Sequence, residues 1–292
     1  MTTRSEWLAW DRDPVTRAQV QQLVDAQEWD TLEKRMTPRI AFGTAGLRAS
    51  MGAGFAHMNK LVVIQTTQGL AAHLLATDAD VKRKGVVVGH DHRHQSDAFA
   101  RLTAAVFVTA GIRVHFFKGI CATPLVPFAV TSRGAAAGIM ITASHNPKND
   151  NGYKLYGGNG AQIIPPTDGF VAAAILQNLE PTTWDETIVD QPDHPLVTIV
   201  DGTVLETYLA NMRANLRFTI ADAAAANVPL PKIVYTAMHG VGHRFVERAF
   251  ATFGLPLPDP VTQQCQPDPE FPTVQFPNPY IRRCTFFLSA PF

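Results

Sequence analysis

The sequence has few cysteines and no long apolar run. Its 292 residues include only three cysteines, widely spaced and without a Cys-x-x-Cys pair, which favours free thiols in a reducing compartment over disulfides or a zinc finger. No stretch reaches the roughly 18 apolar residues of a membrane span. The opening MTTRSEWLAWDRDP is charged where a secretory signal would be apolar. These features predict a cytoplasmic protein with no membrane partner.

An excess of one charge is also missing. Twenty-five basic residues balance twenty-five acidic ones, and we find no dense run of lysine and arginine. A nucleic acid or an anionic membrane normally requires such a basic surface, so neither is an expected partner. Because 46% of the residues are hydrophobic, the chain can form a sizeable core and has room for about two domains. A small-molecule ligand fits this composition best.

The hydrophobic pattern predicts interleaved helices and strands. Val20, Leu23, Val24 and Leu32 recur at roughly helical spacing, which predicts a leading amphipathic helical segment over residues 14–36. Such interleaving is typical of an α/β sheet. In order, the later expected elements are a helix at 58–76, a strand and turn at 84–91, a helix at 96–111, a strand at 112–117, a buried strand within 135–144 and a helix capped near Thr167.

The pattern changes near residue 200. The stretch EPTTWDETIVDQPDHPLV, residues 180–197, is polar and broken by prolines, which indicates a domain boundary. Beyond it, a helix at 202–218, a strand at 232–238 and a helix at 244–254 predict a second α/β unit that is incomplete. The expected organisation is an N-terminal helical segment at 1–40, an α/β domain at 41–200, a partial second domain at 201–280 and a tail at 281–292.

The stretch GIMITASHNPKNDNGYKLYGGNG, residues 138–160, places Ser144 and His145 at the carboxyl end of a predicted strand. Ligands of open α/β sheets gather at such ends. A serine hydroxyl needs a base, a cation or a metal to become a strong nucleophile. A serine hydrolase is the weakest interpretation, because G-x-S-x-G is absent and adjacent side chains diverge on an extended segment. A plain Ser-His-Asn-Pro surface turn is the alternative without chemistry.

Two motifs resemble a known family. TASHNPKNDNGYKLYGGNGAQI, residues 142–163, closely resembles the phosphoserine loop of the α-D-phosphohexomutase superfamily, and FGTAGLR, residues 42–48, resembles its amino-terminal active-site segment. The segment VVVGHDHRHQS, residues 86–96, resembles the family's strand and loop ending in Asp-x-Arg-x-x-Ser. Together with WLAWDRDPVT, these motifs look most like the branch that contains phosphopentomutase, also called phosphoglucomutase-2. The resemblance covers roughly residues 5–280 and ends at the tail.

The resemblance implies a fold and a reaction. The implied fold is a phosphohexomutase-type mixed α/β sheet domain followed by an incomplete second α/β domain. In the family, a phosphoserine gives its phosphoryl group to a sugar monophosphate, and a sugar bisphosphate is the intermediate. The implied catalytic residues are Ser144, His145 and Lys154. Arg48 would bind substrate with them and neutralise charge on the transferring group, and sugar monophosphates and bisphosphates are the implied partners.

The histidines of residues 90–94 allow two interpretations. His90, His92 and His94 alternate as metal ligands on one strand face would, but the segment is typical of a turn, and the resemblance implies no metal there. We therefore expect structural roles for all three. Arg93 fits equally well a role in positioning the active-site loops and a purely structural salt bridge.

The family's Mg²⁺ site is incomplete in this sequence. In the family, Mg²⁺ bridges the phosphoserine, here Ser144, and three aspartates of a D-x-D-x-D-R loop. The 292 residues contain no such loop, nor the family's sugar-recognition and second phosphate-binding loops. We therefore expect a C-terminally truncated mutase that is inactive alone, whose parent interconverts ribose or deoxyribose 1- and 5-phosphate or glucose 1- and 6-phosphate. The alternatives are a complete, divergent two-domain protein and a non-catalytic sugar-phosphate-binding or interaction protein.

Overall fold

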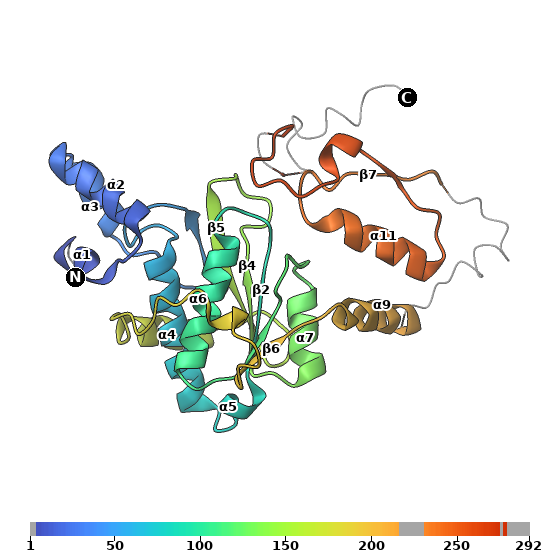
Figure 1. The fold of residues 1–292 in the computed structure, drawn as a ribbon, viewed down its shortest axis with the longest axis horizontal. Helices are drawn as coiled ribbons and strands as arrows, with labels where there is room; N and C mark the ends of the chain where they lie inside the picture. The colour runs from blue at the N-terminus through green and yellow to red at the C-terminus, as the bar shows by residue number, and fades with distance from the viewer. Residues whose placement is uncertain (1–3, 216–230, 275–276, 279–292) are drawn as a thin grey trace.

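The computed structural model describes residues 4–215, 231–274 and 277–278. It shows a larger α/β lobe and a smaller C-terminal lobe that follow each other along the chain (Figure 1). The expected tail at 281–292 lies outside the described residues. None of the helices in the described ranges is long and apolar enough to cross a membrane.

The N-terminal segment contains short helices rather than one continuous helix. Helix α1 (Arg4–Trp10) precedes α2 (Pro14–Asp25) and α3 (Trp29–Met36). The expected helical segment at 14–36 is therefore divided in two, because Gln27 adopts a left-handed φ of 55°. The side chain of Trp7 is fully buried and meets the ring of Phe55 edge-on at 4.9 Å. This contact attaches the helices to the larger lobe.

The larger lobe is built on a six-stranded mixed sheet with the order β1-β5-β4-β2-β3-β6. The inner strands β4, β2 and β3 run parallel with β6, whereas β5 is antiparallel to both β4 and β1. The mixed α/β fold class is confirmed. The strands are β1 (Leu47–Ser50), β2 (Val86–His90), β3 (Val114–Phe116), β4 (Ala137–Ile141), β5 (Asp150–Gly157) and β6 (Val197–Ile199).

Helices cover both faces of this sheet. Alternate residues of β2 face opposite sides: Val86 and Val88 belong to the core under α4 and α6, whereas Val87 belongs to the core under α7. Full burial of such side chains contributes about 1.5–3 kcal/mol each, so β2 is fixed from both sides at the centre of the sheet. The covering helices are α4 (Lys60–Thr77), α6 (Ser96–Thr109) and α8 (Thr167–Leu176) on one side and α7 (Leu125–Arg133) on the other, with the short α5 (Val81–Lys84) before β2.

One local expectation needs correction. Helix α8 begins at Thr167, but Pro166 precedes it and no side chain caps its first turn.

The polar stretch 180–197 contains some regular structure. It includes the 3₁₀ turn η1 (Ile188–Asp190) and the first residue of β6. Strand β6 is recruited by parallel pairing with β3, a long-range contact that overrides the local polar composition.

The smaller lobe follows β6. Helix α9 (Thr203–Asn215) packs on α7 of the larger lobe, where the rings of Phe128 and Tyr208 meet at 5.2 Å. Beyond α9, β7 (Val234–Tyr235) pairs in parallel with β8 (Asp259–Pro260), and the strand expected at 232–238 is thus only two residues long. Helix α11 (Gly242–Phe253) and the 3₁₀ turn η2 (Thr262–Gln264) complete the described elements.

Candidate functional site

Ser144 lies in a tight turn directly after β4. Its backbone adopts a left-handed φ of 55°, and the residue is exposed. The Ser144 amide donates to Thr142 Oγ1 at 2.9 Å, and the Asn146 amide donates to the carbonyl oxygen of Ala143 at 3.1 Å. A strained conformation of this kind persists only where the surroundings hold it in place. The turn therefore presents the serine to solvent at the carboxyl end of a central strand.

Asp91 organises the floor beneath this turn. It follows β2, and its buried carboxylate accepts a hydrogen bond from Thr142 Oγ1 at 2.6 Å and from Ser96 Oγ at 2.7 Å. The backbone amide of Arg93 donates to the same carboxylate at 3.0 Å. A buried carboxylate is tolerated when such donors satisfy it. Asp91 thus connects the loop after β2 to the strand that leads to Ser144.

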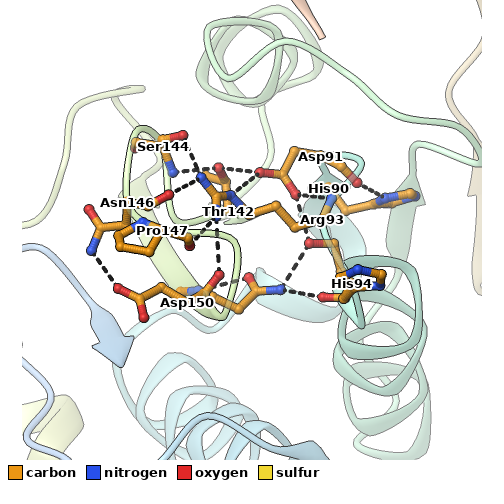
Figure 2. A network of polar contacts seen from close by, with 12 residues as sticks. His90, Asp91, Arg93, His94, Thr142, Ser144, Asn146, Pro147 and Asp150 are labelled. Carbon is orange, nitrogen blue, oxygen red and sulfur yellow. Dashed lines mark hydrogen bonds and ion pairs between the residues drawn. The ribbon is translucent and has the colours of Figure 1, made fainter. Parts of the chain in front are cut away.

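Arg93 fixes the turn from the inside. Its guanidinium donates to the carbonyl oxygens of Ser144 at 2.9 Å, Asn146 at 2.8 Å and Pro147 at 2.8 Å, with a longer contact to that of Asp150 at 3.4 Å (Figure 2). Its Nε also lies 3.5 Å from the Asp91 carboxylate. Both interpretations of Arg93 therefore describe part of its geometry: it forms a buried ion pair and it holds the Ser144 loop.

Two further cations lie at the same edge of the sheet. Arg48 on β1 donates to Asn146 Oδ1 at 3.1 Å, and it pairs in register with Gly152 of β5. Lys154, also on β5, is partly buried, and this burial lowers its pKa, with a further lowering by Arg48 that Asp91 partly offsets. The sheet edge beside the Ser144 turn thus carries two cationic side chains that do not depend on a bound ligand for their position.

Gly46 allows the FGTAGLR segment to approach β5. It has a φ of 76°, and a Cβ atom there would lie 1.8 Å from the carbonyl oxygen of Tyr153. Any larger residue would therefore push β1 away from β5. The close approach that Gly46 permits thus sets the position of Arg48, two residues later.

The three histidines near Arg93 point to different partners. The ring of His90 is buried and its Nδ1 lies 2.8 Å from the Asp91 carbonyl oxygen, whereas His92 packs edge-on against Phe271 at 5.3 Å. His94 Nε2 lies 2.5 Å from Glu270. Within the described parts of the chain, no three His, Cys, Asp or Glu side chains are grouped so as to hold a metal ion. These residues do not fit a Mg²⁺ site by themselves.

The structure brings most of the expected site residues together. Ser144 and His145 share the exposed turn, and Arg48 and Lys154 lie on the two strands beside it. Asp91 was not singled out from the sequence, although it begins the Asp-x-Arg-x-x-Ser match; Thr142, at the start of TASHNP, was also missed. Both residues lie inside motifs that resemble the family, and those matches could have identified them. Their shared role depends on a contact between two loops 51 residues apart.

The protein is of the three-layer mixed α/β class, with an exposed serine turn and fixed cations at one edge of its sheet. Comparison with known sequences then gives its family. Residues 39–181 match the phosphoglucomutase/phosphomannomutase alpha/beta/alpha domain I, and residues 206–285 match domain II of the same proteins. The chain belongs to the phosphoglucomutase/phosphomannomutase family and, more broadly, to the phosphohexomutase superfamily.

Named relatives narrow the comparison. The chain is 49% identical over 282 residues to a probable phosphoribomutase of Schizosaccharomyces pombe, covering 94% of this chain and 46% of that relative. It is 44% identical over 283 residues to human phosphopentomutase, covering 94% and 45%, and 40% identical over 286 residues to human glucose 1,6-bisphosphate synthase, covering 95% and 45%. The chain thus spans about half the length of these relatives.

A solved structure agrees with this assignment. The putative phosphomannomutase of Thermus thermophilus superposes with a TM-score of 0.67 at 29% sequence identity, covering 87% of this chain and 52% of that one.

Proposed function

We propose that this chain carries the phosphoserine half of a phosphosugar mutase site, with Ser144 as the phosphoryl carrier. The observation that supports this most is the exposed Ser144 turn, whose carbonyl oxygens are held by the buried Arg93 guanidinium. A phosphoserine carries about −1.5 to −2 charge near neutral pH and requires nearby cations. Arg48 and Lys154 are such cations, in a family whose relatives are phosphosugar mutases.

The proposed reaction passes the phosphoryl group from Ser144 to the sugar and back. A hydroxyl of a sugar monophosphate attacks the phosphorus of phosphorylated Ser144, a new O–P bond forms and the Oγ–P bond breaks. The hydroxyl proton passes to a base, for which His145 is our candidate, and is returned to Ser144 Oγ, which leaves as a neutral hydroxyl. Arg48 and Lys154 neutralise charge on the moving phosphoryl group. The reverse transfer, from the other position of the bisphosphate, restores phosphoserine. Such reactions depend chiefly on positioning and electrostatic stabilisation.

Sugar monophosphates and bisphosphates are the proposed ligands. Relatives at 40–49% identity are named for ribose, pentose and glucose phosphate chemistry, so both pentose and hexose phosphates belong in the test. A cytoplasmic location remains part of the proposal, because the cysteine content favours a reducing compartment.

We further propose that these 292 residues do not turn over sugar phosphate by themselves. Among the described residues no three His, Cys, Asp or Glu side chains are grouped so as to hold a metal ion, so in this proposal the phosphate on Ser144 is the ligand that they would supply to Mg²⁺. Phosphoryl transfer without the aspartate loop that holds Mg²⁺ and without the second phosphate-binding loop loses most of its electrostatic stabilisation. Binding of a bisphosphate without turnover, as in a non-catalytic sugar-phosphate-binding protein, is the expected behaviour of the chain alone.

A chimaera tests this proposal. Residues 1–278 of this chain are joined to the C-terminal half of the S. pombe relative, and the product is incubated with labelled glucose 1,6-bisphosphate, Mg²⁺ and ribose 1-phosphate or glucose 1-phosphate. We expect label on the Ser144 peptide and mutase turnover in the chimaera, and no turnover in the chain alone. The matched control is Ser132→Ala, at an exposed serine of α7. Undiminished label in Ser144→Ala would refute the assignment of the carrier.

A further inference from the structure

A segment of the smaller lobe lies against the Ser144 loop of the larger lobe. We call residues 268–274, with the sequence DPEFPTV, the docking segment. It contacts both loops of the candidate site, the one after β2 and the one after β4. These contacts join residues up to 176 positions apart in the sequence.

Phe271 covers the buried arginine that holds the serine turn. Its ring lies 5.2 Å from the Arg93 guanidinium carbon and meets the His92 ring at 5.3 Å. Only 2% of Phe271 is exposed. A cation over an aromatic face is attracted by about 0.5–2 kcal/mol, most where water is excluded. Phe271 therefore shields the guanidinium from water and favours its present orientation towards the turn.

Glu270 connects the same two loops through its two oxygens. Oε1 lies 2.5 Å from His94 Nε2, and Oε2 accepts a hydrogen bond from Lys148 Nζ at 2.6 Å. Lys148 belongs to the Ser144 loop, and His94 follows Arg93 in the neighbouring loop. These two hydrogen bonds, the one from Lys148 first, lower the pKa of Glu270. One carboxylate of the smaller lobe thus bridges the turn and the loop that supports it.

The smaller lobe holds the docking segment in an unusual conformation. Thr273 Oγ1 lies 2.8 Å from His239 Nε2 and accepts a hydrogen bond from Gln264 Nε2 at 2.9 Å. Met238, His239 and Phe271 have left-handed φ angles of 48°, 61° and 49°. Strained residues of this kind cluster where the surrounding structure fixes a functional geometry. The segment is thus presented by its own lobe in the conformation that meets the serine turn.

We propose that the docking segment is a positioning element that stabilises the Ser144 turn in the conformation that binds an anion. Glu270 does so through Lys148 and His94, and Phe271 through Arg93. The proposal rests on the proposed function for the meaning of the turn, but its structural claim is independent of it. Contact between the lobes and order in the serine turn are then coupled: when the segment leaves, the turn opens more often and binds phosphate less well.

Hydrogen exchange on the 292-residue chain tests the structural claim. The amides of Ser144, Asn146 and Asp150 each donate a hydrogen bond within the turn and report its opening. In Glu270→Gln and Phe271→Ala we expect these amides to exchange about five- to thirtyfold faster, with unchanged exchange in β2 and β4. Unchanged exchange of the turn amides in both variants would overturn the proposal.

Two controls accompany this measurement. Glu206→Gln removes a carboxylate of equal side-chain exposure, 55%, that pairs with Arg248 between α9 and α11, and it should leave the turn amides unchanged. The double variant Lys148→Glu with Glu270→Lys reverses one ion pair and should recover part of the lost protection, which a general loss of packing would not do. Circular dichroism shows whether Phe271→Ala is folded. If it is not, Glu270→Gln, at an exposed residue, still provides the test.

Calorimetry with glucose 1,6-bisphosphate separates this proposal from the proposed function. A wild-type chain that does not bind contradicts the proposed function, and the exchange result then decides on the docking segment alone. If the wild type binds, Glu270→Gln should weaken the affinity about five- to thirtyfold while Glu206→Gln does not, because a turn that opens more often must be reordered on binding. Equal affinities in all three proteins would contradict a positioning role.

Discussion

The Arg93 guanidinium lies 2.9 Å from the carbonyl oxygen of Ser144 and 2.8 Å from that of Asn146, so one buried side chain holds the backbone on both sides of His145. Arg93 comes 51 residues before Ser144 in the sequence. The planar fork of the guanidinium suits several acceptors in fixed directions, which an ammonium group does not reproduce. The turn is therefore organised by a loop of a different strand.

Arg93→Lys is expected to lower the free energy of unfolding. The buried lysine would keep a charge but could not reach the same set of carbonyl oxygens, and hydrogen bonds to charged groups contribute about 1.5–3 kcal/mol. Urea unfolding gives the difference. Arg101→Lys, at a more exposed site paired with Asp97 and Asp190, is the matched control, with an expected loss below about 1 kcal/mol. Equal losses in the two variants would contradict the special role of Arg93.

Thr142→Val should destabilise the chain more than a similar change elsewhere. The valine keeps the shape but removes the 2.6 Å hydrogen bond to Asp91 and the acceptor for the Ser144 amide. A buried carboxylate that loses a donor costs about 1–3 kcal/mol. Thr103→Val in α6 is the control, because this buried hydroxyl donates to the Phe99 carbonyl oxygen of its own helix. Thermal unfolding of the two variants side by side tests the ranking.

Local patterns predict the centre of this fold better than its edges. Strands β2 and β4 are buried along their whole length, so their apolar runs are visible in the sequence. Strand β6 is only three residues in a polar, proline-rich stretch and exists because β3 pairs with it. The division of the 14–36 segment at Gln27 depends on a single left-handed residue, which hydrophobic spacing does not reveal.

The candidate site likewise contains residues that the sequence identifies and contacts that it does not. Ser144 and Arg48 were found because each lies in a distinctive motif, and the sheet brings these motifs together. The sequence left the role of Arg93 open between two interpretations, because that role depends on which backbone oxygens surround its guanidinium in three dimensions. The docking of Phe271 on Arg93 joins residues far apart in the chain, and neither local composition nor helical or strand period contains that information.

Lys154→Met should separate activity from stability. Burial and Arg48 lower the pKa of Lys154, so folding disfavours the charged form. This cost is fully present below the folded-state pKa and disappears as pH rises through that value towards the unfolded-state pKa. The variant should therefore be as stable as wild type or more stable near pH 7, with the difference in Tm narrowing in alkaline buffer. A stability loss at pH 7 would contradict this sign.

The same variant should lose activity in the chimaera described above. A charge-assisted contact made chiefly in the transition state contributes about 1.5–3 kcal/mol, so we expect kcat/KM to fall roughly ten- to a hundredfold or somewhat more. Lys118→Met, at an exposed lysine beside Asp190, is the control and should keep wild-type kinetics. Wild-type kinetics in Lys154→Met would show that this lysine is not part of the site.

Cys121 should resist alkylation in the folded chain. Burial raises the pKa of this thiol to about 12, and only the thiolate reacts. With iodoacetamide at pH 8, we expect peptide mapping to show modification of Cys121 about a hundredfold or more slower than that of the partly exposed Cys265. Denaturant should abolish the difference. Rapid labelling of Cys121 in the native chain would mean that the core under α7 opens more readily than its packing implies.

The proposed domain at 41–200 should fold without the smaller lobe. Strand β6 completes the sheet at Ile199, so a chain that ends at residue 201 retains every strand of the larger lobe. A chain that ends at residue 215 is the matched comparison, because it adds α9 and buries Val204 and Leu209. We expect cooperative urea unfolding for both chains and higher stability for the longer one. A non-cooperative transition in the shorter chain, with a cooperative one in the longer, would move the boundary from residue 200 to the end of α9.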